Sequence, residues 1–264
     1  LPETPVTLTF NRDAYKATVT LDGKAFMSGG KVDMSKDHKL VVSYDGTKQE
    51  WTLKAATISN NPVLPGQYAD PDIDYFPGEN GEPGKFWIYP TTDGFSGWNG
   101  NYFHAWSSED LVHWTDEGVI LDVNKDNAGK GLTSTDYADS KIDNIAYSPW
   151  SVGSAWAPTI EAKKVNGKTQ YFFYYCAKKT GGESSIGVAV ADNPAGPFKP
   201  ADQPLVTRSM EGVTVGQAID PSIFTDDDGT SYILYGNGSP AIAQLGDDMI
   251  SIVPGTVRKI NGLK

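Results

Sequence analysis

Short runs that alternate apolar and polar residues fill the first part of the chain. In each run apolar side chains recur at every second position, and Asp-Gly or Gly-Gly pairs separate several of the runs. The runs are 6–10, 17–21, 39–44 and 50–55. A period of two is the pattern of a half-buried β-strand, and such pairs are typical of turns. The pattern predicts a small N-terminal β-sandwich-like module over residues 1–60. Trp51 is expected in its core, and an exposed Trp51 that binds sugar is the alternative.

From residue 61 onward a longer pattern occurs three times. Each copy opens with a short phrase that contains proline, and then has apolar, aromatic-rich runs separated by turn residues. The three phrases are Ala69-Asp70-Pro71-Asp72-Ile73, Trp156-Ala157-Pro158-Thr159-Ile160 and Ile219-Asp220-Pro221-Ser222-Ile223. Each copy has room for four strands, which is the pattern of a β-propeller blade. The sequence therefore predicts an all-β fold, with residues 61–264 forming the first part of a β-propeller.

Blades that pack radially bring their innermost strands toward a common centre. The repeat gives Asp70, Ala157 and Asp220 equivalent innermost positions, so we expect the two carboxylates to converge. Propellers close with about four to eight blades, and about three are encoded here. We therefore expect the chain to be part of a longer polypeptide, or to be completed by a C-terminal fragment or a second chain. Residues 122–155 are expected to form an insertion between the first two blades.

Composition and charge exclude several classes of protein. The chain has 264 residues and a formal net charge of −11, which argues against a nucleic-acid partner because phosphate binding needs clustered Lys and Arg. Its single cysteine, Cys176, lies in an apolar run and is expected to be a buried, inert thiol. No apolar run approaches the roughly 18 residues of a membrane span. Residues 1–5 lack the pattern of a signal peptide, so any leader has been removed or was never included.

Several phrases from residue 61 onward occur in the same order as in a known family. They are the residues 61–71, Ser107-Ser108-Glu109-Asp110-Leu111-Val112-His113-Trp114, Ala155-Trp156-Ala157-Pro158 and Ile219-Asp220-Pro221-Ser222. In this order they resemble glycoside hydrolase family 43. Members of that family are five-bladed propeller enzymes that act on arabinose- and xylose-containing plant polysaccharides. The likeness extends over some 200 residues.

The resemblance implies an inverting mechanism that uses three carboxyl groups. Asp70 matches the general base that activates water, and Asp220 matches the carboxylate that orients the general acid and raises its pKa. The acid itself is a Glu in a later blade, so the resemblance implies that it lies beyond the end of this chain and that the chain is C-terminally incomplete. Inversion needs the acid and the base about 6.5–9.5 Å apart, with water between the base and the sugar.

Two tryptophans are candidates for binding the substrate. Trp156 lies in the second repeat phrase, and its ring face suits the C–H surface of a sugar. Trp98 lies in a Gly-rich loop after a strand and is expected in the pocket wall. For both, packing in the core is the alternative.

Metal sites and cofactors are not expected from this sequence. The run Asp226-Asp227-Asp228-Gly229 lacks the spacing of a calcium loop and favours a solvated hairpin. The histidines are too scattered for a zinc site. Family members can hold a structural calcium ion through a histidine in a late blade, which has no equivalent here.

The leading hypothesis is thus a glycosidase that cleaves plant cell-wall polysaccharide, either an α-L-arabinofuranosidase or a β-xylosidase. Arabinanase and galactanase activities stay open within the same family. The alternative is a catalytically incomplete propeller fragment that only binds carbohydrate. In either case the partner is an oligo- or polysaccharide, and by analogy the protein is secreted or lies at a bacterial cell surface or in the periplasm.

Overall fold

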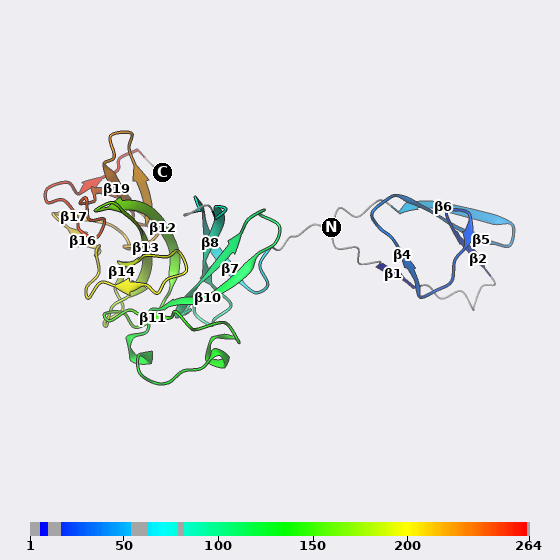
Figure 1. Cartoon of the computed structure of the whole chain (residues 1–264), viewed down its shortest axis with the longest axis horizontal. Helices are drawn as coiled ribbons and strands as arrows, with labels where there is room; N and C mark the ends of the chain where they lie inside the picture. The colour runs from blue at the N-terminus through cyan, green and yellow to red at the C-terminus, as the bar shows by residue number, and fades with distance from the viewer. Residues whose placement is uncertain (1–5, 10–16, 54–62, 79–81, 263–264) are drawn as a thin grey trace. The chain divides into compact units, whose positions relative to one another are not determined.

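The chain divides into two compact units, Leu1–Pro62 and Val63–Lys264. The computed structural model describes residues 6–9, 17–53, 63–78 and 82–262, and Figure 1 draws their strands in chain order. The predicted boundary between the two domains, at residues 60 and 61, lies outside the described residues.

The described residues of the first unit form short antiparallel strands in two sheets. The strands are β1 (Val6–Leu8), β2 (Thr18–Leu21), β3 (Lys24–Ala25), β4 (Gly30–Val32), β5 (His38–Tyr44) and β6 (Thr47–Leu53). One sheet pairs β1 with β4, and the other has the order β3-β2-β5-β6. The expectation that Trp51 lies in a core is wrong, since its side chain is 46% exposed. Strand β6 forms the edge of its sheet, and only Leu53 of its side chains is even partly buried.

The second unit contains three sheets of four or five strands. The strands are β7 (Tyr68–Phe76), β8 (Lys85–Thr92), β9 (Tyr102–Ser108), β10 (Thr115–Asp122), β11 (Ala146–Tyr147), β12 (Trp156–Val165), β13 (Lys168–Lys178), β14 (Ser184–Ala191), β15 (Lys199–Pro200), β18 (Ser222–Thr225), β19 (Ser231–Tyr235), β20 (Ala241–Gln244) and β21 (Arg258–Lys259). The sheets have the orders β11-β10-β9-β8-β7, β12-β13-β14-β15 and β18-β19-β20-β21. A further two-stranded sheet joins β16 (Ser209–Met210) to β17 (Val213–Thr214).

Strands β7, β12 and β18 are the first strands of their sheets, and each forms a sheet edge. Strand β12 contacts both β7 and β18, so the three repeat phrases lie where the sheets meet. This is the arrangement that the repeat predicts for innermost strands.

Alternation along β13 explains how the three sheets are held together. Tyr171, Phe173 and Tyr175 enter a core shared with the first sheet. Phe172 and Tyr174, which alternate with them, enter a second core shared with the third sheet. Because successive side chains of a strand point to opposite faces, one apolar run serves both cores. The middle sheet is therefore covered on both faces.

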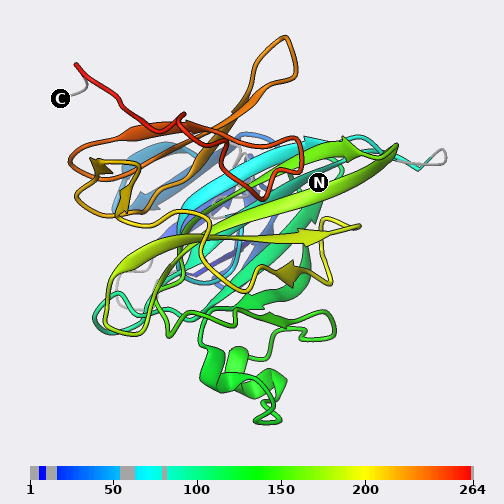
Figure 2. The same ribbon diagram turned by 90° about the vertical axis from the view of Figure 1, so that its left-hand side faces the viewer.

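The insertion between the first two sheets adds structure that the sequence pattern does not predict. Strand β11 pairs in parallel with β10, so the first sheet has five strands and the expectation of four is wrong there. The insertion also contains two 3₁₀-helices, η1 (Lys125–Asn127) and η2 (Ser134–Tyr137), drawn in green below the sheets in Figure 2. The buried Tyr137 hydroxyl donates to Asp122 Oδ2 at 2.8 Å, which ties η2 to the end of β10.

The described elements are strands and short 3₁₀-helices, so the fold is all-β as predicted. Within the described ranges, no helix has the length and apolar character needed to cross a bilayer.

Candidate active site

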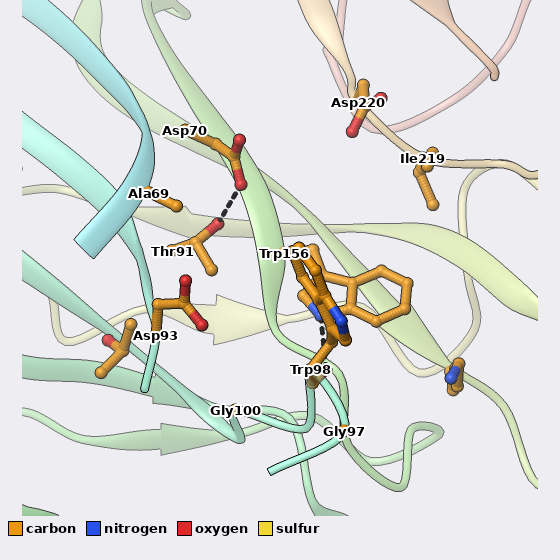
Figure 3. A pocket seen from close by; sticks show the side chains of 12 residues that line it. Ala69, Asp70, Thr91, Asp93, Gly97, Trp98, Gly100, Trp156, Ile219 and Asp220 are labelled. Carbon is orange, nitrogen blue, oxygen red and sulfur yellow. Dashed lines mark hydrogen bonds between the residues drawn. The ribbon is translucent and has the colours of Figure 1, made fainter. Parts of the chain in front are cut away.

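A pocket of about 400 Å³ lies where the three repeat phrases meet. Its lining contains all four residues that the sequence singles out: Asp70, Asp220, Trp98 and Trp156. In Figure 3 the two carboxyl groups lie in one part of the view and the two indole rings lie together in another. The structure therefore brings together residues that are up to 150 positions apart in the sequence, since 220 − 70 = 150.

The backbone is left-handed at the same position of each repeat phrase. The φ angles of Asp70, Ala157 and Asp220 are 45°, 31° and 56°. The strand pairing of β7 and of β12 shifts register at this point, as at a β-bulge, which re-aims a side chain. Positive φ is uncommon for residues other than glycine, although Asp tolerates it better than most. The repeat thus encodes a strained turn that is common to all three sheets.

Two small side chains connect these three strained residues. Thr91 Oγ1 donates to Asp70 Oδ2 at 3.0 Å and accepts from the Ala157 backbone N–H at 2.7 Å. Cys176 Sγ accepts from the Asp220 backbone N–H at 3.1 Å and donates to the Ala157 carbonyl at 3.7 Å. A continuous series of hydrogen bonds therefore runs from Asp70 to Asp220 across three sheets.

Cys176 is a buried thiol, as expected, and it has a structural role beside the pocket. Its side chain is fully buried, and burial raises the pKa of the thiol. The negative charges of Asp220 and Asp70 raise that pKa further. The sulfur therefore stays protonated, which keeps its S–H as a donor to Ala157.

The two carboxyl groups influence each other electrostatically. The pKa of Asp220 is raised, first by burial and second by the negative charge of Asp70. A like charge disfavours ionisation in this way only at short range. The pocket thus places two interacting carboxyl groups beside a hollow that can hold a small ligand.

The two tryptophans form one wall of the pocket and are fixed to each other. The Trp156 indole N–H donates to the Trp98 backbone carbonyl at 2.8 Å, and the Trp98 side chain is 74% exposed. The Lys178 ammonium lies 4.9 Å from the centre of a Trp156 ring, a cation–π contact. Trp156 is half-buried and packs against the second core, whereas Trp98 is exposed, and both line the pocket.

Sequence reasoning missed other residues of the lining. Asp93 and Lys178 line the pocket, as does Thr91. Asp93 follows directly on the end of β8, and its Oδ1 accepts from the Gly94 N–H at 2.8 Å. The only signal for Asp93 in the sequence is the Asp93-Gly94 pair at the end of an apolar strand. Such a pair indicates a turn as readily as a ligand-binding residue.

Within the described residues, no group of three or more His, Cys, Asp or Glu side chains could hold a metal ion. His38 belongs to the first unit, whereas His104 and His113 lie in or beside the first sheet of the second.

The family model for "Glycosyl hydrolases family 43" matches residues 59–263. An arabinoxylan arabinofuranohydrolase of Bacillus subtilis is 35% identical over 201 residues, which cover 64% of this chain and 35% of that protein. A β-D-galactofuranosidase, xynD, of Aspergillus niger is 34% identical over 214 residues, which cover 76% of this chain and 53% of that protein. The chain thus spans between about a third and a half of the length of these relatives.

A solved structure agrees with this result. The crystal structure of a glycoside hydrolase family 43 arabinoxylan arabinofuranohydrolase from Bacillus subtilis, in complex with cellotetraose, superposes with a TM-score of 0.60 and 31% identity. The match covers 77% of this chain and 43% of that structure. The predicted propeller-type all-β fold is confirmed, whereas the number of blades stays a prediction.

Proposed function

Because the chain belongs to glycosyl hydrolase family 43, we propose that its pocket takes part in hydrolysing a glycosidic bond of a plant cell-wall polysaccharide, with inversion. The observation that carries this proposal is that Asp70 and Asp220 line one pocket and interact electrostatically.

Asp70 is proposed as the general base. Its side chain is exposed to the pocket, and the Thr91 hydroxyl fixes the position of Oδ2. A carboxylate held in this way can accept a proton from the attacking water on the face opposite the leaving group. Proton transfer to a general base typically contributes about 10²–10⁴-fold in rate.

Asp220 is proposed as the carboxyl group that orients the general acid and keeps it protonated. Its own pKa is raised by burial and by Asp70, so the region disfavours further negative charge. The described lining of the pocket contains no glutamate. We therefore propose that the acid is a glutamate outside this lining, as the family resemblance implies.

The proposed substrate is a neutral furanoside, and the proposed activity is that of an α-L-arabinofuranosidase. Both relatives described above are named for furanose sugars. The rings of Trp98 and Trp156 offer apolar surface for the C–H groups of one sugar. β-Xylosidase activity is the runner-up that the experiment below separates.

A carbohydrate-binding fragment without turnover is the second candidate. It is favoured by one observation, the lack of a glutamate in the described lining. Both candidates need the same sugar contacts, so only turnover distinguishes them. The secreted or surface location stays a prediction, as does completion of the propeller by a further fragment or chain.

The test compares 4-nitrophenyl α-L-arabinofuranoside with 4-nitrophenyl β-D-xylopyranoside. We expect faster release of nitrophenol from the arabinofuranoside, and proton NMR should show the inverted anomer first. Asp220→Asn should lower the rate while leaving the affinity for arabinose nearly unchanged. If the protein binds arabinose saturably but turns over neither substrate, the proposal of hydrolysis is wrong and the carbohydrate-binding function is supported.

A further inference from the structure

His38 is a buried histidine at the start of β5, in the first unit, and its side chain is 6% exposed. Both nitrogens of its ring have a close partner. Nδ1 lies 2.7 Å from Asp22 Oδ2, and Nε2 lies against the Asp33 backbone carbonyl oxygen. A carbonyl oxygen and an ionised carboxylate both accept hydrogen bonds and donate none. The ring is therefore placed between two acceptors.

These two acceptors determine the protonation state of the ring. A neutral imidazole carries one N–H and can donate to one of them, whereas an imidazolium ion donates through both nitrogens. The Asp22 carboxyl group is ionised at neutral pH, because hydrogen bonds from the Lys39 backbone N–H and the His38 side chain lower its pKa. Neither acceptor has a proton to offer the ring. The geometry therefore requires a doubly protonated, positively charged His38.

The ring connects the two sheets of the first unit. Asp22 lies in the turn between β2 and β3, and these strands share a sheet with β5 and β6. Asp33 directly follows β4, which pairs with β1 in the other sheet. The charged ring thus holds the end of β4 against the β2–β3 turn.

The backbone fixes the position of Asp22 independently of the ring. The φ angles of Asp22 and Gly23 are 51° and 78°, as in the two-residue turn that a β-hairpin favours. The Asp22 N–H donates to the Lys39 carbonyl at 2.8 Å, and Asp22 Oδ1 accepts from the Lys39 N–H at 2.8 Å. Because Asp22 is held in this way, its Oδ2 stays in place whether or not the ring donates to it.

Other charged side chains lie on the elements around the ring. They are Lys24 on β3, Asp33, Lys36 and Asp37 in the loop between β4 and β5, and the ion pair of Lys39 with Glu50 on β5 and β6. The Asp33 carbonyl and, after it, the Asp22 side chain raise the pKa of His38, whereas burial and the positive charge of Lys36 oppose them. On balance the pKa of His38 lies above its usual value of 6.5.

A raised pKa in the folded state makes the link between the sheets depend on pH. The folded unit binds the proton more tightly than the unfolded chain does. The stabilisation is fully present below about pH 6.5 and is lost as the pH rises through the raised pKa of His38. Once the proton leaves, a ring nitrogen without hydrogen faces an acceptor, and burial limits its replacement by water.

We propose that His38 is a pH-sensitive link in the first unit. As an imidazolium ion it joins the two sheets through Asp22 and the Asp33 carbonyl, and its deprotonation at higher pH loosens β4 from the β2–β3 turn. The first unit therefore responds to pH through one side chain, independently of any hydrolysis in the second unit.

The test is an NMR titration of the full chain across about pH 5–9, observed at the histidine ring nitrogens and the backbone amides. We expect both ring nitrogens of His38 to carry hydrogen at neutral pH. Loss of one of these protons should coincide with a change in the amide signals of β4. Asp22→Asn should lower the midpoint of the His38 titration by at least about one pH unit, a tenfold weaker hold on the proton. Asparagine tolerates the positive φ of this turn, so the variant keeps the backbone.

Asp110→Asn is the matched control. Asp110 Oδ2 lies 2.7 Å from His113 Nδ1 in the second unit, where the His113 side chain is 76% exposed. This variant removes the same kind of contact and should leave the His38 midpoint unchanged.

Three results would overturn the proposal. They are a single ring N–H on His38 at neutral pH, β4 amide signals that do not follow the His38 titration, and a His38 midpoint that Asp22→Asn lowers no more than Asp110→Asn does. The first two are measured on the unaltered protein, so they decide the question even if Asp22→Asn fails to fold.

Discussion

Among the three equivalent residues of the repeat phrases, Ala157 adopts positive φ at the highest conformational cost. Asp70 and Asp220 have side chains that tolerate this conformation, whereas alanine gains nothing from it. The Ala157 N–H and carbonyl are nevertheless the atoms to which Thr91 and Cys176 are hydrogen-bonded. The strain at Ala157 is thus maintained by the contacts that join the Asp70 carboxylate to the Asp220 backbone N–H.

Replacing Ala157 by glycine should therefore stabilise the protein. Glycine adopts positive φ without steric cost, and this gain exceeds the extra chain entropy of the unfolded state. We expect a gain of about 0.5–1 kcal/mol, measured by thermal unfolding. Ala155→Gly is the control, because Ala155 is fully buried and is not among the residues at positive φ. Ala155→Gly should destabilise the protein. If both variants stabilise it, positive φ at Ala157 is not the source of the gain.

Thr91 is a positioning residue, since its hydroxyl contacts Asp70 and Ala157. Thr91→Val should lower kcat about tenfold and change KM little, because about 1.4 kcal/mol of positioning is lost at the proposed base. Thr91→Ser keeps the hydroxyl and should restore most of the rate. Equal loss in the serine and valine variants would show that packing, rather than the hydrogen bond, is what matters.

The pocket residues that could be predicted lie in the repeated phrases or, for Trp98, in a Gly-rich loop after a strand. Asp70, Asp220, Trp98 and Trp156 all line the pocket, although their roles stay predictions. Thr91 could not be predicted, because its partner Ala157 is 66 residues away and meets it only when two sheets pack. The bond from Asp220 to Cys176 spans 44 residues for the same reason.

Strands β7 and β12 bring acidic residues together, Asp72 and Asp74 from β7 and Glu161 from β12. Asp72 Oδ2 accepts from the Ile160 N–H at 2.9 Å, which joins the first two sheets. Burial, and after it the negative charges of Asp72 and Glu161, raise the pKa of Asp74 to about 7. Asp74 is therefore protonated in the folded protein at mildly acidic pH, whereas it ionises near pH 4 when unfolded.

This raised pKa makes stability depend on pH. Since the folded state binds the proton more tightly, the stabilisation is fully present below about pH 4 and is lost as pH rises through about 7. Asp74→Asn should thus stabilise the protein at pH 8, by about 1–2 kcal/mol after allowance for solvent screening. At pH 4 it should have little effect.

The measurement is thermal unfolding of both proteins at pH 4 and pH 8. Asp228→Asn is the control, because the Thr230 N–H lowers the pKa of that exposed carboxyl. Asp228→Asn removes this carboxylate and should destabilise the protein above pH 4, whereas Asp74→Asn should stabilise it. An Asp74→Asn effect that is the same at both pH values would contradict the raised pKa.

In the second unit, strand positions were predictable where a short apolar run is bounded by turn residues. The runs at 170–176, 186–191 and 231–235 all lie in strands. Strand β11 could not be predicted, because two residues are too short to show a period. The exposure of Trp51 was also missed, since alternation shows which residues share a face and not whether another element covers it.

At the scale of the whole second unit, the middle sheet carries most of the packing. Phe173 contacts the rings of Tyr89, Phe103 and Phe198 and is fully buried. Strands β7 and β18 carry exposed large apolar side chains, as with Tyr75 at 53% and Phe224 at 52%. Stability should therefore depend far more on β13 than on β7 or β18.

Phe173→Ala should destabilise the second unit by about 3–5 kcal/mol, because it leaves a cavity between two sheets. Phe224→Ala removes an equally large ring that is half exposed, and it should cost less than about 1 kcal/mol. Urea unfolding, followed by the near-ultraviolet signal of the aromatic rings, measures both. Similar costs for the two variants would show that the middle sheet is not the centre of packing.

The central claim is that Asp70 activates water in the pocket that it shares with Asp220. The most direct measurement is the rate of hydrolysis of 4-nitrophenyl α-L-arabinofuranoside by the unaltered protein, by Asp70→Asn, and by Asp226→Asn as a control on an exposed hairpin. We expect Asp70→Asn to lower kcat at least about a hundredfold with the fold intact, while Asp226→Asn keeps the full rate. Turnover that survives Asp70→Asn would contradict it.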